Sequence, residues 1–304
     1  MDRRLFVRAG LGAVAGLALA REVRPFPARP ATRPPLPFDL VAVRGGEPEA
    51  MFDRGIEAMG GMQAFVARGA KVVVKPNIGW DVGPERAGNT NPRLVRRIIE
   101  HCFEAGAKQV TVFDHTCDNW QRCYRSSGIE QAARDAGASV APGNAESYYQ
   151  DVAIPRGKNL KNAKEHEALL AADVFINVPV LKHHSSSRLT LAMKNMMGVV
   201  WDRGTWHADD LHRCIADYAT YRKPQLNVLD AYAVLKRNGP RGVSTDDVVV
   251  MKSQLLSADI VAVDAAAAKL WGMEPADVRH IALAHDEKVG RMDLDRLSIK
   301  RIAL

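Results

Sequence analysis

Apolar runs of strand length alternate with helical patterns along most of this chain, and this alternation constrains its fold more than any other feature. Strands separated by helices of about ten or more residues imply crossover connections and a mainly parallel sheet. We therefore predict an α/β fold, with a mainly parallel sheet flanked by helices, in a single large domain that leaves room for an inserted lobe. The predicted strands are 40–43, 71–75, 109–114, 174–180, 226–229 and 248–255, and the predicted helices lie near 50–68, 92–105, 128–136 and 208–221.

Glycine and aspartate mark several expected helix ends. Gly-Ala pairs at 69–70, 106–107 and 137–138 each precede a predicted strand, as expected where a helix closes. Asp259 is placed to cap a helix over 260–270. The recurrence of the Gly-Ala pairs favours the α/β interpretation, and the role of Asp259 is structural.

The first 20 residues resemble a twin-arginine export signal. Arg3 and Arg4 precede an apolar run over 9–20, which ends in a small-residue cleavage pattern at 18–20. The run is shorter than the roughly 20 residues that a membrane-spanning helix needs. We therefore expect no stable membrane span, and export by the twin-arginine machinery to the periplasm or cell envelope. An uncleaved anchor and a cytoplasmic protein with a chance Arg-Arg start are the alternatives.

Residues 21–37 contain six prolines and are predicted to be an extended tether, so that the globular domain covers 38–304. The formal net charge is +7, and removal of residues 1–20, with three arginines and one aspartate, leaves +5. These charges are scattered, without a long basic run or interleaved aromatics. Nucleic acid is therefore not an expected partner.

Four cysteines stand at 102, 117, 123 and 214. No C-x-x-C pattern occurs, so their spacing does not indicate a zinc or iron-sulfur site. A disulfide between Cys117 and Cys123 is one reading that an oxidising envelope would permit. Cys102 lies on a helical pattern and is expected to fill the core.

The segment 174–198 carries the strongest functional signal. A buried strand is predicted over 174–181, with Lys182, His183 and His184 at its end, and a short helix from about Arg188 to a stop near Gly198 carries Lys194 and Asn195. So much buried positive charge requires an anion nearby. Carboxyl ends of parallel strands are also where ligands bind in open α/β sheets.

Other predicted strands also end in polar residues. The apolar residues 72–74 lead into Lys75 and Asn77, and the apolar residues 110–113 lead into Asp114 and His115. Residues 228–229 lead into Asp230, which is followed by a loop with Asn238 and Gly239. If these strands are parallel, their ends share one edge of the sheet. We therefore expect one active site there.

The three lysines at 75, 182 and 194 would form an electropositive pocket suited to a carboxylate or phosphate. Crowded cations also lower lysine pKa values, which can create a base or nucleophile. Structural ion pairs with Asp114, Asp230, Asp259 or Asp264 are the alternative. The candidate catalytic residues are Lys182, His184, Lys194 and His207, and the candidate substrate-binding residues are Lys75, Asn77, Asn195, Asp230, Asn238 and Gly239.

A divalent metal is a further candidate, because imidazole and carboxylate suit zinc, iron or nickel. Its ligands would be Asp114, His115, His184 and His207, with His183 as a substitute for His184. No HExxH pattern supports this site. The histidines at 101, 166, 280 and 285 lack this context and are expected to be structural or on the surface.

Seven segments in order resemble the bacterial and archaeal proteins grouped as domain of unknown function 362. These segments are 72–77, 91–107, 175–184, 191–198, 211–231, 237–242 and 256–272. The resemblance implies an α/β domain, which in relatives is sometimes joined to a ferredoxin-like segment with two iron-sulfur clusters. This chain lacks the cysteine spacing for that segment, so we expect no iron-sulfur cluster of its own. The family implies no general reaction.

Two departures from the family pattern stand out. Where relatives read Leu-Lys-Thr-His, this chain reads Leu181-Lys182-His183-His184, so His184 matches the family position and His183 is extra. Where relatives have Gly-Asp-Ser-Pro-Gly, this chain has residues 113–117, of which Asp114 alone matches. His207 also matches a family position.

Two functions follow as hypotheses. The first is an exported enzyme, an oxidoreductase or isomerase, that binds a small anionic substrate with a metal or redox cofactor as an option; hydrolysis is less favoured because no G-x-S-x-G elbow occurs. The second is a non-catalytic envelope protein that binds or matures a metal or a redox partner protein.

Overall fold

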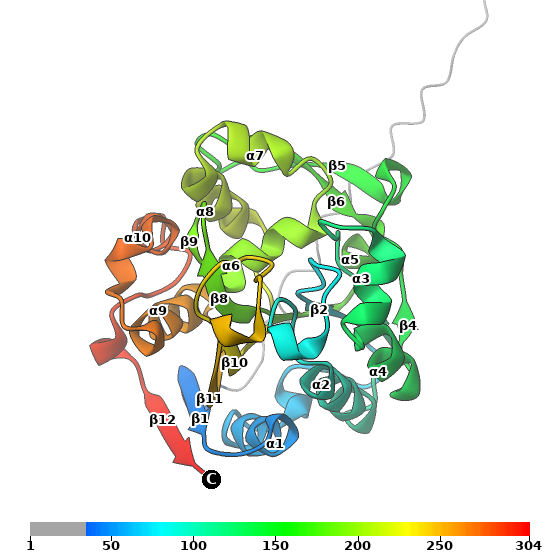
Figure 1. The fold of residues 1–304 in the computed structure, drawn as a ribbon, viewed down its shortest axis with the longest axis vertical. Coiled ribbons are helices and arrows are strands. Elements are labelled where there is room, and N and C mark those ends of the chain that lie inside the picture. Colours follow the sequence, from blue (N-terminus) through cyan, green and yellow to red (C-terminus); the bar gives the residue numbers. More distant parts are fainter. Residues whose placement is uncertain (1–34) are drawn as a thin grey trace, which may run out of the picture.

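The computed structural model describes residues 35–304, so the predicted signal and residues 21–34 of the predicted tether lie outside the described part. The chain folds around a large mixed sheet, mostly parallel, with helices on both faces (Figure 1). This architecture confirms the predicted α/β class. The domain boundaries at 20 and 37 stay predictions.

The large sheet has the strand order β12-β1-β11-β10-β7-β2-β3-β4. Its middle strands β10, β7, β2 and β3 are parallel, whereas β11 runs antiparallel to both β1 and β10. The strands are β1 (Leu40–Arg44), β2 (Lys71–Pro76), β3 (Gln109–Val112), β4 (Ser139–Val140), β7 (Val174–Val178), β10 (Leu226–Leu235), β11 (Val248–Ser257) and β12 (Ile299–Ala303). The chain segments that follow β2, β3 and β7 therefore leave the sheet at the same edge, as predicted.

Each face of the sheet has its own hydrophobic core, because successive side chains of a strand point to opposite faces. In β2, Val72 and Val74 belong to one core and Val73 to the other. The first core includes helices α1 (Pro48–Ala58), α2 (Pro92–Glu104), α3 (Trp120–Ser126) and α4 (Ile129–Asp135). The second includes α5 (Glu167–Leu170), α6 (Ala192–Asn195), α7 (Gly204–Ala208), α8 (Leu211–Tyr221), α9 (Ile260–Trp271) and α10 (Arg279–Asp286).

Helix ends follow the local sequence. Asp259 caps α9, since its carboxylate accepts from the N–H groups of Val261 and Ala262, as predicted. The helix predicted over 50–68 is wrong in length, because α1 already ends at Ala58. Gly60 and Gly61 both have positive φ, 97° and 82°, which breaks the helix before a short 3₁₀ turn over Met62–Ala64.

The segment 174–198 differs from its prediction. The strand over 174–181 is interrupted at Pro179, which has no N–H to donate to a neighbouring strand. It resumes as β8 (Val180–His184), which pairs with β10 and forms a hairpin with β9 (Arg188–Thr190). Lys182 and His184 therefore lie within a strand rather than beyond its end. The predicted helix from Arg188 is wrong as well, since α6 begins only at Ala192 and a 3₁₀ turn continues over Met196–Val199.

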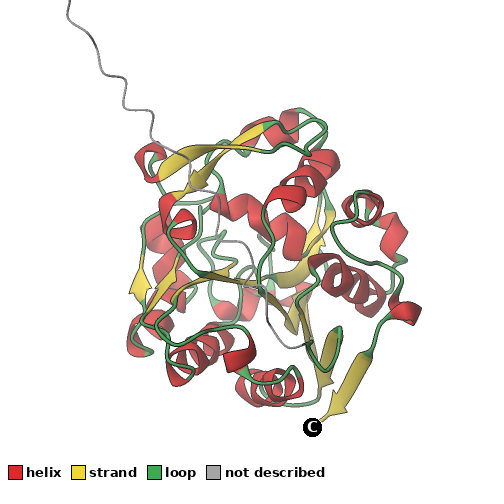
Figure 2. Ribbon diagram, turned by 180° about the vertical axis from the view of Figure 1, so that it is seen from behind, coloured by secondary structure: helices red, strands yellow, loops and turns green. Residues whose placement is uncertain are grey.

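A separate two-stranded sheet, β5 (Tyr149–Ala153) and β6 (Asn162–His166), lies at the same end of the molecule as α7 and was not predicted (Figures 1 and 2).

All four cysteines are free in the structure, and Cys102 is buried in the core as expected. Within residues 35–304, no helix is long and apolar enough to cross a membrane.

Candidate functional site

A cavity of about 260 Å³ opens where the strand ends of β2 and β3 meet the β8–β9 hairpin and α6. It brings together nine of the predicted site residues. These are Lys75, Asn77, Asp114, His115, Lys182, His184, Lys194, Asn195 and His207. Lys75, Lys182 and Lys194, which come from separate segments of the sequence, thus line one cavity.

Strand alternation sorts the residues of β8. Lys182 and His184 lie on the same face of the strand, and both line the cavity. His183 points to the other face, where its Nδ1 accepts a hydrogen bond from the Gly239 N–H at 3.1 Å. The extra histidine of the Leu-Lys-His-His sequence is therefore outside this cavity, and it lines a separate surface hollow instead.

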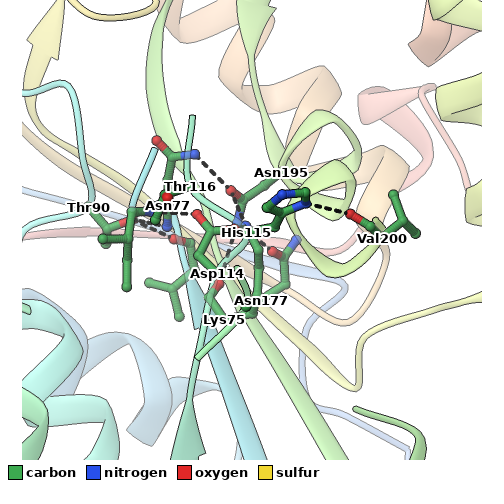
Figure 3. A network of polar contacts seen from close by, with 12 residues as sticks. Lys75, Asn77, Thr90, Asp114, His115, Thr116, Asn177, Asn195 and Val200 are labelled. Carbon is green, nitrogen blue, oxygen red and sulfur yellow. Dashed lines mark hydrogen bonds and ion pairs between the residues drawn. The ribbon is translucent and has the colours of Figure 1, made fainter. Parts of the chain in front are cut away.

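Lys75 and Asp114 form a buried ion pair at the base of the cavity (Figure 3). The Lys75 Nζ lies 2.9 Å from Asp114 Oδ1 and donates to Asn195 Oδ1 at 2.9 Å. The other oxygen, Asp114 Oδ2, accepts from the Ile78 N–H at 2.6 Å. Burial lowers the pKa of Lys75, and the carboxylate of Asp114 opposes this shift.

Buried asparagines continue this network into the sheet. Asn195 Nδ2 donates to Asn177 Oδ1 at 2.8 Å, and Asn177 Nδ2 donates to Asn227 Oδ1 at 3.0 Å. Asn177 and Asn227 also face each other in the β7–β10 pairing. Because each amide has its donor and acceptor groups matched to a neighbour, the network fixes the position of Asn195.

The Lys182 ammonium lies in the cavity and has no carboxylate partner in the part of the chain that the structure describes. Its Nζ donates to Asn77 Oδ1 at 2.9 Å and to the carbonyl oxygen of Gly88. The side chain is 1% exposed, and burial lowers the pKa of Lys182 to about 7. This lysine can therefore exchange a proton near neutral pH.

Lys194 is the least satisfied cation of the cavity. Its ammonium forms no hydrogen bond or ion pair with any other described residue. Burial lowers the pKa of Lys194 to about 8. The carboxylate of Asp264 accepts from the N–H groups of Ala192 and Met193 at 2.6 and 3.0 Å, which anchors the start of α6 and so positions Lys194.

His184 is a neutral hydrogen-bonding group. Its Nδ1 accepts from the Ser186 N–H at 3.1 Å, so the ring proton of the neutral form resides on Nε2. Burial, together with Lys194 and Lys182, lowers the pKa of His184 to about 2. The imidazole thus provides an N–H donor without adding charge.

The predicted metal ligands are not arranged as a metal site. Within residues 35–304, no three His, Cys, Asp or Glu side chains come together in a way that could hold a metal ion. Asp114 is engaged by Lys75 and the Ile78 N–H, and His115 Nδ1 lies 3.0 Å from the Val200 carbonyl oxygen. The predicted ligand atoms therefore already contact other groups of the protein or lie next to cationic side chains. The set Asp114, His115, His184 and His207 does not fit a metal ion.

Three predicted substrate-binding residues lie apart from the cavity lining. Asp230 is buried and accepts from the N–H groups of Asn91 and Tyr232. Asn238 donates to Asp247, and Gly239 packs against the carbonyl oxygen of His183. The loop reaches the cavity with the next residue, Pro240.

The structure adds lining residues that were not predicted, chiefly Thr190, Arg203 and Cys117. Thr190 faces Lys182 across the β8–β9 hairpin, so recognising that hairpin in the sequence would have placed it. Arg203 donates to the carbonyl oxygens of His115 and Thr116. No local sequence signal distinguishes Arg203 from the other scattered arginines.

Comparisons with known proteins agree with the seven-segment resemblance. Residues 72–269 match the family model described as Domain of unknown function (DUF362). The thylakoid-associated protein sll1697 of Synechocystis sp. is 26% identical over 243 residues, which cover 77% of this chain and 73% of that protein. Among solved structures, the lactate racemase apoprotein of Thermoanaerobacterium thermosaccharolyticum matches at a TM-score of 0.43 and 11% identity over 70% of this chain. The match spans about half, 53%, of that protein's length.

Proposed function

The chain belongs to the DUF362 family, and we propose that it is an enzyme that binds a small anionic substrate in the cavity and transfers a proton to or from it. The observation that carries this proposal is Lys182, a buried lysine that lines the cavity and has no carboxylate partner within residues 35–304. A general base works best with a pKa near the working pH, and burial brings the pKa of Lys182 to about 7.

The neighbours of Lys182 support its role in proton transfer. Asn77 Oδ1 and the Gly88 carbonyl oxygen accept hydrogen bonds from its Nζ and hold the amine in place. Both acceptors are uncharged, so they orient the group without fixing its proton as a carboxylate would. Lys75 differs in this respect, because Asp114 favours its charged form.

Lys194 and His184 are the proposed anion-binding groups. An unpaired ammonium and a neutral imidazole N–H both donate to a carboxylate or phosphate oxygen. A substrate held there would present a neighbouring C–H or O–H group to Lys182. The neutral Lys182 amine would take the proton, become an ammonium, and return the proton to the same atom or another one.

This proton exchange fits an isomerase best. The base and the anion site alone complete such a reaction, since the proton that leaves the substrate returns to it. An oxidoreductase would use the same base and would also need an electron acceptor.

Solvent isotope exchange tests the proposal. The purified protein is incubated in D₂O with a panel of small hydroxy and keto carboxylates and phosphates, and deuterium incorporation is read by mass spectrometry. We expect incorporation into at least one compound, with a loss of at least about 100-fold in Lys182→Met, since general bases contribute on the order of 10²–10⁴-fold. Lys108→Met is the matched control, because Lys108 is exposed and immediately precedes β3, at the opposite edge of the sheet.

Ligand binding without exchange would contradict catalysis and favour the alternative of a non-catalytic binding protein. Absence of both binding and exchange across the panel would contradict the site assignment itself.

The proposed place of action is the periplasm or cell envelope. The N-terminal Arg3-Arg4 pattern and the apolar run after it support export by the twin-arginine route. Replacing both arginines by lysine keeps the charge and should leave the protein inside the cell, as measured by fractionation. Unchanged export of this double variant would contradict the proposal.

A further inference from the structure

We propose that the ligand of this cavity carries two negative charges, and that Lys194, Arg203 and the Thr190 hydroxyl bind it together with Lys182. This inference rests on the proposed function and specifies its substrate class as a small dianion, either a dicarboxylate or a phosphomonoester.

The excess of cationic over anionic side chains in the cavity lining supports a dianionic ligand. Four cationic side chains line the cavity, Lys75, Lys182, Lys194 and Arg203, whereas Asp114 is the sole carboxylate among the described lining residues. Asp114 is already paired with Lys75 at 2.9 Å. The other three cations therefore lack a carboxylate counter-charge within the described lining.

Arg203 is fixed in place but not neutralised. Its guanidinium donates to the carbonyl oxygens of His115 and Thr116, which are uncharged. Two of its five N–H donors are used in this way, and the others remain for a ligand. A planar guanidinium of known orientation is well suited to carboxylate and phosphate oxygens.

Thr190 provides a second, independent indication of a ligand. Its Oγ1 is buried without a hydrogen-bond partner among residues 35–304, and the residue is 4% exposed. Thr190 lines the cavity opposite Lys182 in the β8–β9 register. A buried hydroxyl is costly to leave unpaired, so a polar ligand atom at this position would satisfy it.

A dianion matches these groups better than a monoanion. A single negative charge would leave at least one of Lys194, Arg203 and protonated Lys182 without compensation in a mostly buried cavity, which is unfavourable. Two negative charges would offset two cations while Lys182 exchanges its proton. The neutral His184 adds a donor and leaves this balance unchanged.

The test compares matched ligands by calorimetry at constant ionic strength. Succinate is measured against its monomethyl ester, and glycerol phosphate against glycerol phosphate methyl ester, so that each pair differs by one negative charge. We expect at least one dianion to bind roughly tenfold more tightly than its singly charged ester, which is the size of one charge-assisted contact. Comparison of the succinate pair with the glycerol phosphate pair shows whether the cavity prefers a dicarboxylate or a phosphomonoester.

Two variants and a control complete the test. Lys194→Met should abolish the preference for the doubly charged ligand, and Thr190→Val should weaken its binding several-fold. Lys108→Met should leave both affinities unchanged. Equal binding of an ester and its parent dianion in both arms would overturn this inference and leave the proposed function standing. Failure of every anion to bind would overturn both.

Discussion

The base of the cavity and the wall that β8 and α6 form use the same residue type in opposite ways. At the base, Lys75 is paired with Asp114, and the neighbouring asparagines are hydrogen-bonded to one another. In the wall, Lys182 and Lys194 have no carboxylate partner among the described residues. A nearby carboxylate makes a buried lysine part of the structure, whereas its absence leaves the lysine available to a ligand or to proton exchange.

The largest expected effect concerns the paired lysine. Lys75→Met leaves the buried Asp114 without its counter-ion, and we expect it to lower the free energy of unfolding by about 3–5 kcal/mol. Urea denaturation provides the measurement. The control Arg96→Met breaks the exposed Arg96–Glu100 pair and should cost less than about 1 kcal/mol. Equal losses in the two variants would remove the distinction between the base and the wall.

The pH dependence of stability tests the unpaired Lys182. Burial lowers its pKa to about 7 from the value of 10.5 expected for an exposed lysine. Between these values the unfolded chain binds the proton and the folded chain does not, so stability rises with pH, by up to about 1.4 kcal/mol per pH unit. The difference in the free energy of unfolding between the wild type and Lys182→Met should therefore increase from pH 7.5 to 9. A flat difference would mean that Lys182 keeps an ordinary pKa.

A smaller loss of stability is expected from a substitution at Gly198, whose backbone lies close to the ion pair at the base of the cavity. A Cβ added at Gly198 would lie 1.8 Å from Asp114 Oδ1 and 2.6 Å from Lys75 Nζ. Gly198→Ala should therefore displace the ion pair and destabilise the protein by about 1–3 kcal/mol. Gly204→Ala is the matched control, since a Cβ there meets nothing within 4 Å. Thermal unfolding of the two variants compares them, and similar melting temperatures would count against a tightly packed base.

The smallest effect is expected at Lys194. Lys194→Met removes an ammonium that has no partner among the described residues, so the free energy of unfolding should stay within about 1 kcal/mol of the wild type or increase. Ligand binding would be lost while the fold is kept. A marked loss of stability in denaturation experiments would instead show that Lys194 has a structural role like that of Lys75.

Much of this architecture could be predicted because it depends on local patterns. The apolar runs and the helix-capping Asp259 are properties of short segments, and they located the strands and the start of α9. The parallel arrangement of β2, β3 and β7 then placed Lys75, Asn77 and Asp114 at one edge. The predicted helix over 50–68 was too long because Gly60 and Gly61 end it early, and the predicted strand over 174–181 was too long because Pro179 interrupts it.

The sequence by itself determined the α/β class and the edge of the sheet at which the polar residues gather. Strands that alternate with helices along the chain are expected to be parallel, so the residues that follow them lie at one edge. Only the tertiary structure decided which lysine is neutralised. Lys75 and Asp114 are far apart in the sequence and meet through the pairing of β2 with β3. The β8–β9 hairpin turns Lys182 and Thr190 into the cavity and His183 away from it. Charge compensation depends on distances of a few ångströms, and only the packing of distant segments sets those distances.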